Sequence, residues 1–345
     1  MNRGAAEARL DELWKRGTAF LGTRTAILGG AMTWVSERHL VSAMSNGGGF
    51  GVLACGAMNP DQLAAEIDGT VALTKKPFGV NLITMHPQLA ELIEVCIAKN
   101  VGHVVLAGGV PSQTSIGLLK EAKRKVICFA PALVMAKRLV RLGADAIVIE
   151  GMEAGGHIGP VSTSVLAQEV LPALKDVPVF VAGGIGRGEA ILAYLEMGAA
   201  GCQLGTRFVC ATECIAHSRF KEAFIRASAR DAQPSVQIDP QFTVIPVRAL
   251  INQATARFAE TQREVIDLFR RGELDQKEAQ LKIEHFWAGA LRRAVIDGDV
   301  ENGSVMAGQS VGLVTREQPA REIIDELVNQ ALIALTARTE NLAAE

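Results

Sequence analysis

The chain has 345 residues, a length that suits either a barrel of about 250 residues with an appendage or two ordinary domains. Its 35 basic and 37 acidic side chains give a net charge of −2. This balance argues against a nucleic-acid partner, because proteins that bind nucleic acid carry a basic surface. With 49% hydrophobic and 21% charged residues, the composition excludes disorder over most of the chain.

The N-terminal segment contains charges throughout and has no apolar core of a secretory signal. No window approaches the roughly 18 apolar residues that a membrane span requires. The six cysteines form no CxxC pair and lie mostly in apolar runs, as expected of reduced, buried thiols. We therefore expect a cytoplasmic protein with no membrane partner and no metal site.

Eight short apolar runs, each rich in Val, Ile or Leu, recur along the first two thirds of the chain. They lie at 26–28, 51–54, 78–82, 103–107, 125–129, 146–150, 178–182 and 201–205. Their hydrophobicity is continuous rather than alternating, which is typical of strands covered on both faces and therefore of a parallel sheet.

The segments between these runs, such as 60–73 and 130–142, have helical periodicity. Eight β/α repeats predict an α/β fold, a closed (β/α)₈ TIM barrel. An open dinucleotide-binding sheet is disfavoured, because no GxGxxG motif follows the first run.

The pattern changes after about residue 210. Residues 212–302 contain two long helical stretches, 251–271 and 276–295, and no strand-like run. We expect this segment to be a helical appendage that covers the carboxyl end of the barrel as a cap or substrate domain. Residues 303–345 then return to the barrel with an amphipathic helix at 320–335, so that the barrel comprises 1–211 and 303–345.

Two glycine turns follow the seventh and eighth predicted strands, at Gly183 and Gly184 and at Gly205 and Thr206. Glycine lets backbone amides approach an anion closely, and the loops after these two strands commonly bind phosphate in a barrel. Either turn could also serve only as a tight connection, but the pair together predicts a phosphate site.

A glycine-rich loop after the sixth strand presents a single imidazole, that of His157. Histidine is suited to proton transfer near neutral pH or to hydrogen bonding with a carbonyl group. Its position at the carboxyl end of a barrel strand favours a functional role over a structural one. Glu150 and Glu153 could orient the ring or a ligand, and a capping or solvated role is equally consistent with the sequence.

Asn81 lies at the end of the third strand, where its amide can both donate and accept hydrogen bonds at the edge of a flavin or a substrate carbonyl. HExxH, GxSxG and GxxxxGK[ST] motifs are absent from the sequence, which gives no support to zinc peptidase, serine hydrolase or P-loop chemistry.

Taken together, these motifs resemble the flavin-dependent barrels that include nitronate monooxygenases and the FabK-type enoyl-ACP reductases. The matching stretches are GGAMTWV at 29–35, PFGVN at 77–81, EGMEAGGHIG at 150–159, AGGI at 182–185, GTRF at 205–208 and GSVMAGQ at 303–309. They cover nearly the whole chain in order, and the 151–159 and 303–309 stretches are closer to the FabK branch.

The resemblance implies FMN at the barrel mouth, with its phosphate near the two glycine turns and His157 as the catalytic residue. The residues expected to bind the cofactor are Gly30, Ala31, Met32, Asn81, Glu150, Gly155, Gly156, Ala182, Gly183, Gly184, Gly205, Thr206 and Gln309.

The resemblance also implies an oxidoreductase, and the first hypothesis is an NAD(P)H-dependent enoyl-ACP or other enoyl-thioester reductase that relays hydride through FMN. The alternatives are a nitronate monooxygenase that uses O₂, an NADH:quinone reductase and a non-catalytic FMN-binding module. The sequence does not distinguish NADH from NADPH. The substrate would be a small molecule or an acyl group on a carrier, and a homodimer is possible.

Overall fold

The computed structural model describes residues 2–242 and 246–344, without the side chains of 284, 285, 288 and the residues from 339 onward. Eight parallel strands occur in the spatial order β1-β9-β8-β6-β5-β4-β3-β2. They are β1 (Ile27–Gly29), β2 (Gly51–Ala54), β3 (Phe78–Ile83), β4 (His103–Ala107), β5 (Lys125–Phe129), β6 (Ala146–Glu150), β8 (Val179–Ala182) and β9 (Gly201–Leu204). A parallel bridge between Leu28 and Phe50 joins the first and last strands, so that the sheet closes. The predicted (β/α)₈ TIM barrel is confirmed.

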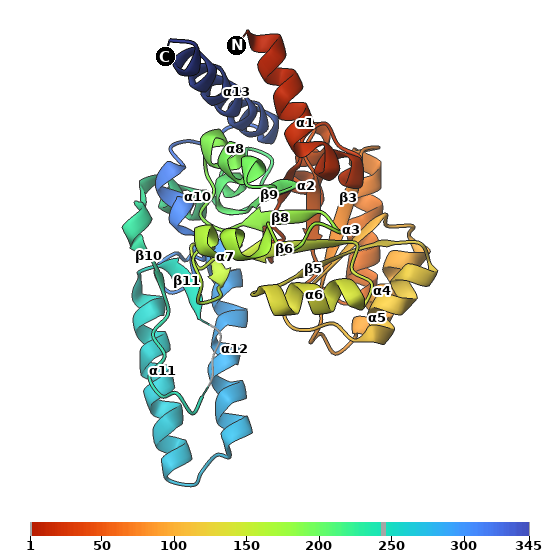
Figure 1. Cartoon of the computed structure of the whole chain (residues 1–345). Coiled ribbons are helices and arrows are strands. Elements are labelled where there is room, and N and C mark those ends of the chain that lie inside the picture. Colours follow the sequence, from red (N-terminus) through yellow and green to blue (C-terminus); the bar gives the residue numbers. More distant parts are fainter. Residues whose placement is uncertain (1, 243–245, 345) are drawn as a thin grey trace.

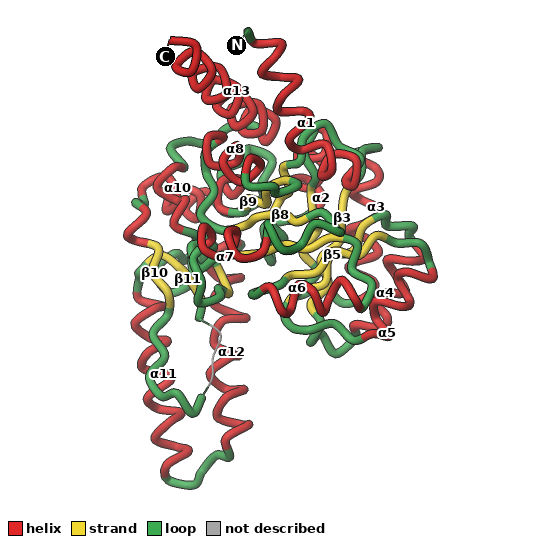
Figure 2. The backbone as a smooth tube through the Cα atoms, viewed as in Figure 1, coloured by secondary structure: helices red, strands yellow, loops and turns green. Residues whose placement is uncertain are grey.

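Helices surround the strands (Figures 1 and 2). They are α2 (Arg38–Asn46), α3 (Pro60–Leu73), α4 (Leu89–Ala98), α5 (Gln113–Glu121), α6 (Leu133–Arg141), α7 (Thr163–Val170), α8 (Gly188–Glu196) and the short α9 (Thr206–Val209). Helix α3 has the predicted bounds because its start is fixed locally. Asn59 and Gln62 form a reciprocal capping box and Pro60 occupies the first turn.

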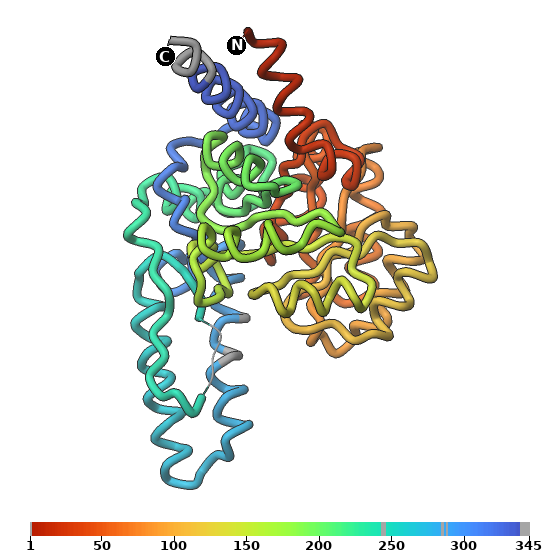
Figure 3. The backbone as a smooth tube through the Cα atoms, in the orientation of Figure 1, coloured from red at the N-terminus to blue at the C-terminus, as the bar shows by residue number. Residues whose placement is uncertain are grey.

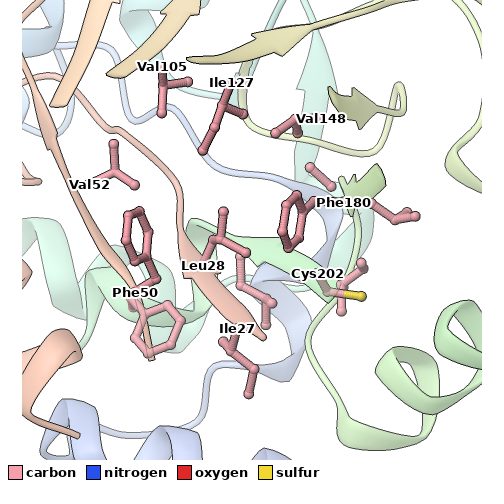
Figure 4. Packing of buried hydrophobic residues seen from close by; sticks show 14 of the residues in the cluster. Ile27, Leu28, Phe50, Val52, Val105, Ile127, Val148, Phe180 and Cys202 are labelled. Carbon is pink, nitrogen blue, oxygen red and sulfur yellow. The ribbon is translucent and has the colours of Figure 1, made fainter. Parts of the chain in front are cut away.

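The barrel interior is filled by side chains. Figure 4 shows Leu28, Val105, Ile127, Val148 and Phe180 gathered in it. All five are fully or almost fully buried, so the centre of the barrel is a packed core and not a channel. A ligand can therefore be bound only at one end of the barrel.

Helix α1 (Arg3–Leu21) closes the amino end of the barrel and lies beside the C-terminal helix α13 (Ala320–Ala344), as Figures 1 and 3 show. The backbone oxygen of Phe20 is 2.9 Å from Nε2 of His103, at the start of β4. A Cβ atom on Gly17 would lie 2.0 Å from the backbone oxygen of Ala200, which shows how closely α1 contacts the barrel. Ligand access is thus left to the carboxyl end.

Residues 212–302 contain helix α10 (Ser218–Arg226) and the hairpin of α11 (Gln253–Arg270) and α12 (Gln276–Val295). The two long predicted helices are confirmed. The hairpin has an apolar cluster of its own, and its tip projects away from the barrel (Figure 1).

The expectation of no strand in this segment was wrong. Strands β10 (Ala232–Pro234) and β11 (Val247–Leu250) form an antiparallel sheet with β7 (Gly156–His157), in the order β10-β11-β7. These strands are only two to four residues long. They exist through pairing with distant segments, which a local pattern does not reveal. No helix in the part of the chain that the structure describes has the length and apolarity to cross a membrane.

Candidate functional site

Three polar side chains belong to the inner face of the barrel at its carboxyl end. Glu150 is paired with Ala182, and Ala182 is paired with Gln203 on the next strand. The side chains of Glu150 and Gln203 therefore point to the same face of the sheet. It is the inner face, because Glu150 is two residues beyond the inward-pointing Val148 (Figure 4). Asn81 joins this face through its pairing with Val105.

Gln203 was not among the predicted residues. Its side chain is only 7% exposed, and its amide makes no hydrogen bond to another described residue. The side-chain amide of Asn81 donates only one long bond, of 3.4 Å, to the Val105 carbonyl oxygen. Neither amide is among the fully buried polar groups that lack a partner, so each keeps hydrogen-bonding capacity that is open to a ligand at this end of the barrel. Sequence inspection could have found Gln203, because it is the polar residue within an apolar strand.

Glu150 is partly buried at the end of β6. Burial raises the pKa of its carboxyl group to about 8. The group is therefore mostly protonated at neutral pH and can donate a hydrogen bond to an acceptor in the mouth.

The first predicted glycine turn, after β8, requires glycine at both positions. Gly183 and Gly184 have φ angles of +100° and +69°. A Cβ atom on Gly183 would lie 2.8 Å from Oγ1 of Thr163, and one on Gly184 would lie 2.9 Å from Cβ of Glu153. Thr163 in turn donates its hydroxyl to Glu153 (2.8 Å) and lies 3.1 Å from the Gly183 carbonyl oxygen. The turn is thus tightly fixed against the loop after β6.

A cavity of about 560 Å³ opens beside this turn, within the range of about 300–1,000 Å³ usual for ligand pockets. Of the predicted residues it borders Gly183, Gly184 and Gln309, and it does not border His157. Its walls are Glu153, Thr163, Gly183, Gly184, Ile185, Ala190, Tyr194, Ala227, Ser228, Ala229, Gln309, Ser310, Gly312 and Leu313.

A second group of predicted residues surrounds the turn after β9. Gly30 is so close to Gly205 that a Cβ atom on Gly30 would lie 3.2 Å from the Gly205 Cα atom. A Cβ atom on Gly205 would lie 3.4 Å from the Met32 sulfur. Ala31 is partly buried against the main core. The loop after β1 and the turn after β9 therefore form one surface at the mouth.

The C-terminal segment joins these two groups. The backbone N–H of Gly308 donates to Oγ1 of Thr206 (2.9 Å). The backbone N–H of Gln309 donates to the Glu153 carbonyl oxygen (2.9 Å). Gly155 also packs closely on this segment, because a Cβ atom on Gly155 would lie 2.5 Å from the backbone nitrogen of Gly308. The structure thus brings together three segments that the sequence singled out separately, 150–159, 205–208 and 303–309.

His157 lies on strand β7 and its side chain is exposed. Its backbone position is fixed by pairing with Val247 of β11, and that of Gly156 by pairing with Arg248. The adjacent Ile158 donates its backbone N–H to the Pro246 carbonyl oxygen (2.9 Å). The appendage therefore supplies the strand that holds the imidazole-bearing loop at the barrel mouth.

Comparison with known proteins agrees with this architecture. The family model for nitronate monooxygenase matches residues 15–106 and 88–330. The structure of FabK from Thermotoga maritima superimposes with a TM-score of 0.83 at 36% identity, covering 95% of this chain and 98% of that one.

Two curated relatives each align with 92% of this chain. A Mycobacterium tuberculosis protein is 31% identical over 92% of this chain and 96% of its own length. It is named (3aS,4S,5R,7aS)-5-hydroxy-7a-methyl-1-oxo-octahydro-1H-indene-4-carboxyl-CoA dehydrogenase. A Staphylococcus aureus protein named as a probable nitronate monooxygenase is 27% identical over 92% of this chain and 98% of its own length. Because the nitronate monooxygenase model matches most of the residues of this chain, the chain belongs to the nitronate monooxygenase family of oxidoreductases.

Proposed function

We propose that this protein is an FMN-dependent reductase of enoyl thioesters, with NADH or NADPH as the reductant and acyl carrier protein or coenzyme A as the acyl carrier. The observation that carries the proposal is the similarity to FabK over nearly the full length of both chains. The name of the Mycobacterium tuberculosis relative, a carboxyl-CoA dehydrogenase, supports a thioester as the substrate.

The residues at the barrel mouth fit FMN. The turn after β8 has glycine at two positions with positive φ, and Gly205 begins the turn after β9, so the backbone of each turn could approach an anion such as the FMN phosphate. The side-chain amide of Gln203, on the inner face of the barrel, is not among the fully buried unpaired groups, so it is open to a ligand, and a flavin edge would provide both donors and acceptors. The cavity beside Gly183, Gly184 and Gln309 has the volume of a ligand pocket, and it supports the part of the assignment at the first glycine turn, because Asn81 and Gln203 do not border it.

In this assignment, Gly183, Gly184, Gly205 and Thr206 hold the phosphate, with Thr206 also fixing the C-terminal segment through Gly308. When bound, FMN supplies the hydride transfer between the nicotinamide and the double bond. The other residues predicted to contact the cofactor line the approach to FMN. They are residues 30–32, Gly155, Gly156, Ala182 and Gln309.

The polar groups of the inner face have separate roles in this assignment. Asn81 and Gln203 bind and orient the ring edge, because an amide can both donate and accept. The protonated carboxyl group of Glu150 donates a hydrogen bond at neutral pH. His157, held by β11, polarises the thioester carbonyl or delivers a proton to the reduced substrate.

Anaerobic stopped-flow mixing tests the proposal. Enzyme reduced with NADH is mixed with crotonyl-CoA, and recovery of the oxidised flavin absorbance is followed. We expect crotonyl-CoA to reoxidise the flavin. Butyryl-CoA, which lacks the double bond, is the control and should leave the flavin reduced. Absence of reoxidation by both crotonyl-CoA and an enoyl-acyl carrier protein would contradict it.

Nitronate oxidation is the second candidate function, and the family model together with the Staphylococcus aureus relative favours it. In that reaction His157 would orient the nitronate or assist removal of a proton. Oxygen uptake with propyl-2-nitronate in the absence of any nicotinamide distinguishes it from thioester reduction.

A further inference from the structure

Arg248 lies where the appendage meets the loop that carries His157. It belongs to β11 and is paired with Gly156, the residue before the histidine. Its guanidinium group donates from Nε to the Met152 carbonyl oxygen (3.0 Å), at the start of that loop. A second nitrogen donates to the Ala232 carbonyl oxygen of β10. Arg248 thus contacts both ends of the loop, the start through its side chain and Gly156 through strand pairing, and its side chain also bonds to β10.

The environment of Arg248 is unusual for a cation. The residue is only 2% exposed. Within the described chain it has no carboxylate at ion-pair distance, and the two oxygens to which its side chain donates are neutral carbonyls. Burial lowers the pKa of the guanidinium group, and the more distant negative charge of Glu153 partly opposes this effect. A buried charge without an ion pair lowers stability, so its presence calls for a gain elsewhere.

The geometry points to that gain. We propose that Arg248 is a positioning residue that fixes the loop 151–158 and thereby the imidazole of His157. The catalytic consequence rests on the proposed function of His157, whereas the effect on the loop does not. The appendage would then have a part in the chemistry by holding the histidine.

Arginine suits this role for a geometric reason. The planar guanidinium group donates in several fixed directions and can bind two carbonyl oxygens on different segments at once. A lysine carries the same charge as a single point at the end of a flexible stem. Charge alone therefore should not replace the arginine.

Hydrogen exchange in the flavin-loaded enzyme tests the proposal without any substrate. The variants are Arg248→Met and Arg248→Lys. The matched control is Lys221→Met, which removes another buried cation, one that bonds to Ala211 and Glu317 and makes no contact with the loop. Exchange is measured in peptides covering 151–158 and, as a reference, in peptides from α3 and α4. Flavin content, kcat, KM and the pH profile of kcat are measured on the same samples.

We expect Arg248→Met to speed exchange in 151–158 by about tenfold or more, with the reference peptides unchanged. Arg248→Lys should give a smaller increase. Both should lower kcat more than they raise KM, and change the limb of the pH profile that belongs to the imidazole. Lys221→Met should leave exchange in 151–158 unchanged.

Two results would overturn the proposal. One is unchanged exchange in 151–158 in both Arg248 variants. The other is a loss of protection spread equally over all peptides in Arg248→Lys, which would indicate a general structural role. If the exchange result is as expected but no thioester is reduced by the unaltered enzyme, the proposed function fails and the positioning role of Arg248 stands.

Discussion

Glu150 and His103 are ionisable residues at opposite ends of the barrel, and burial shifts their pKa values in opposite directions. Burial raises the pKa of Glu150 from 4.5 to about 8 and lowers that of His103 from 6.5 to about 4. Both side chains are therefore held in their neutral forms. Each makes stability depend on pH, but in different ranges.

For Glu150, the folded protein keeps a proton between pH 4.5 and about 8 that the unfolded chain releases, so stability falls as pH rises through this range. For His103, the unfolded chain binds the extra proton between about 4 and 6.5, so stability rises with pH there. Of these two residues, only Glu150 still makes stability depend on pH above about 6.5.

We predict that Glu150→Gln removes this loss of stability. Between pH 6.5 and 8, urea unfolding of the flavin-free protein should show the unfolding free energy of the parent falling by at most roughly 2 kcal/mol, with the variant level over the same range. An equal slope in parent and variant would mean that the carboxyl group of Glu150 is ionised in the folded protein.

Removal of the imidazole at residue 157 should affect turnover and not cofactor binding. We predict that His157→Ala keeps its flavin and loses about a hundredfold or more in kcat for an enoyl thioester, the contribution usual for a general acid or base. His39→Ala, which removes an exposed imidazole that bonds to Glu37, serves as the control and should keep its activity. Full turnover in His157→Ala would remove the catalytic role assigned to this residue.

At the scale of single elements, the strands of the barrel were predictable because continuous apolar runs mark buried parallel strands. Strands β10 and β11 were not, because they form only by pairing with β7. Helix α1 was also not predicted. Its buried face is narrow and lies within a polar segment, and only contact with the barrel shows which side is buried.

That buried face makes α1 important for stability. Trp14 is 3% exposed, whereas the side chain of Glu12, two residues away on the same helix, is 65% exposed. We predict that Trp14→Ala lowers the unfolding free energy by about 3–5 kcal/mol, while Glu12→Ala changes it by less than about 0.5 kcal/mol. Chemical unfolding measures both. Equal effects would mean that α1 does not pack on the barrel in solution.

At the scale of the whole molecule, the glycine turns were predictable because a closed barrel brings the ends of all its strands together. The contact between 150–159, 205–208 and 303–309 depends on the return of the C-terminal segment to the barrel, which the amphipathic run at 320–335 predicted. Only the place of Gln309 at the cofactor site was inferred from the family resemblance. The role of β11 and Arg248 in holding the His157 loop could not be predicted, because it depends on an inter-segment register.

The proposed function depends on a flavin bound at the carboxyl end of the barrel. The most direct test is a crystal structure of the protein purified with its coenzyme. We predict FMN with its phosphate at hydrogen-bond distance from the backbone amides of Gly184 and Thr206, the ring beside Asn81 and Gln203, and the His157 imidazole facing it. A flavin bound elsewhere, or a phosphate remote from both glycine turns, would contradict this account.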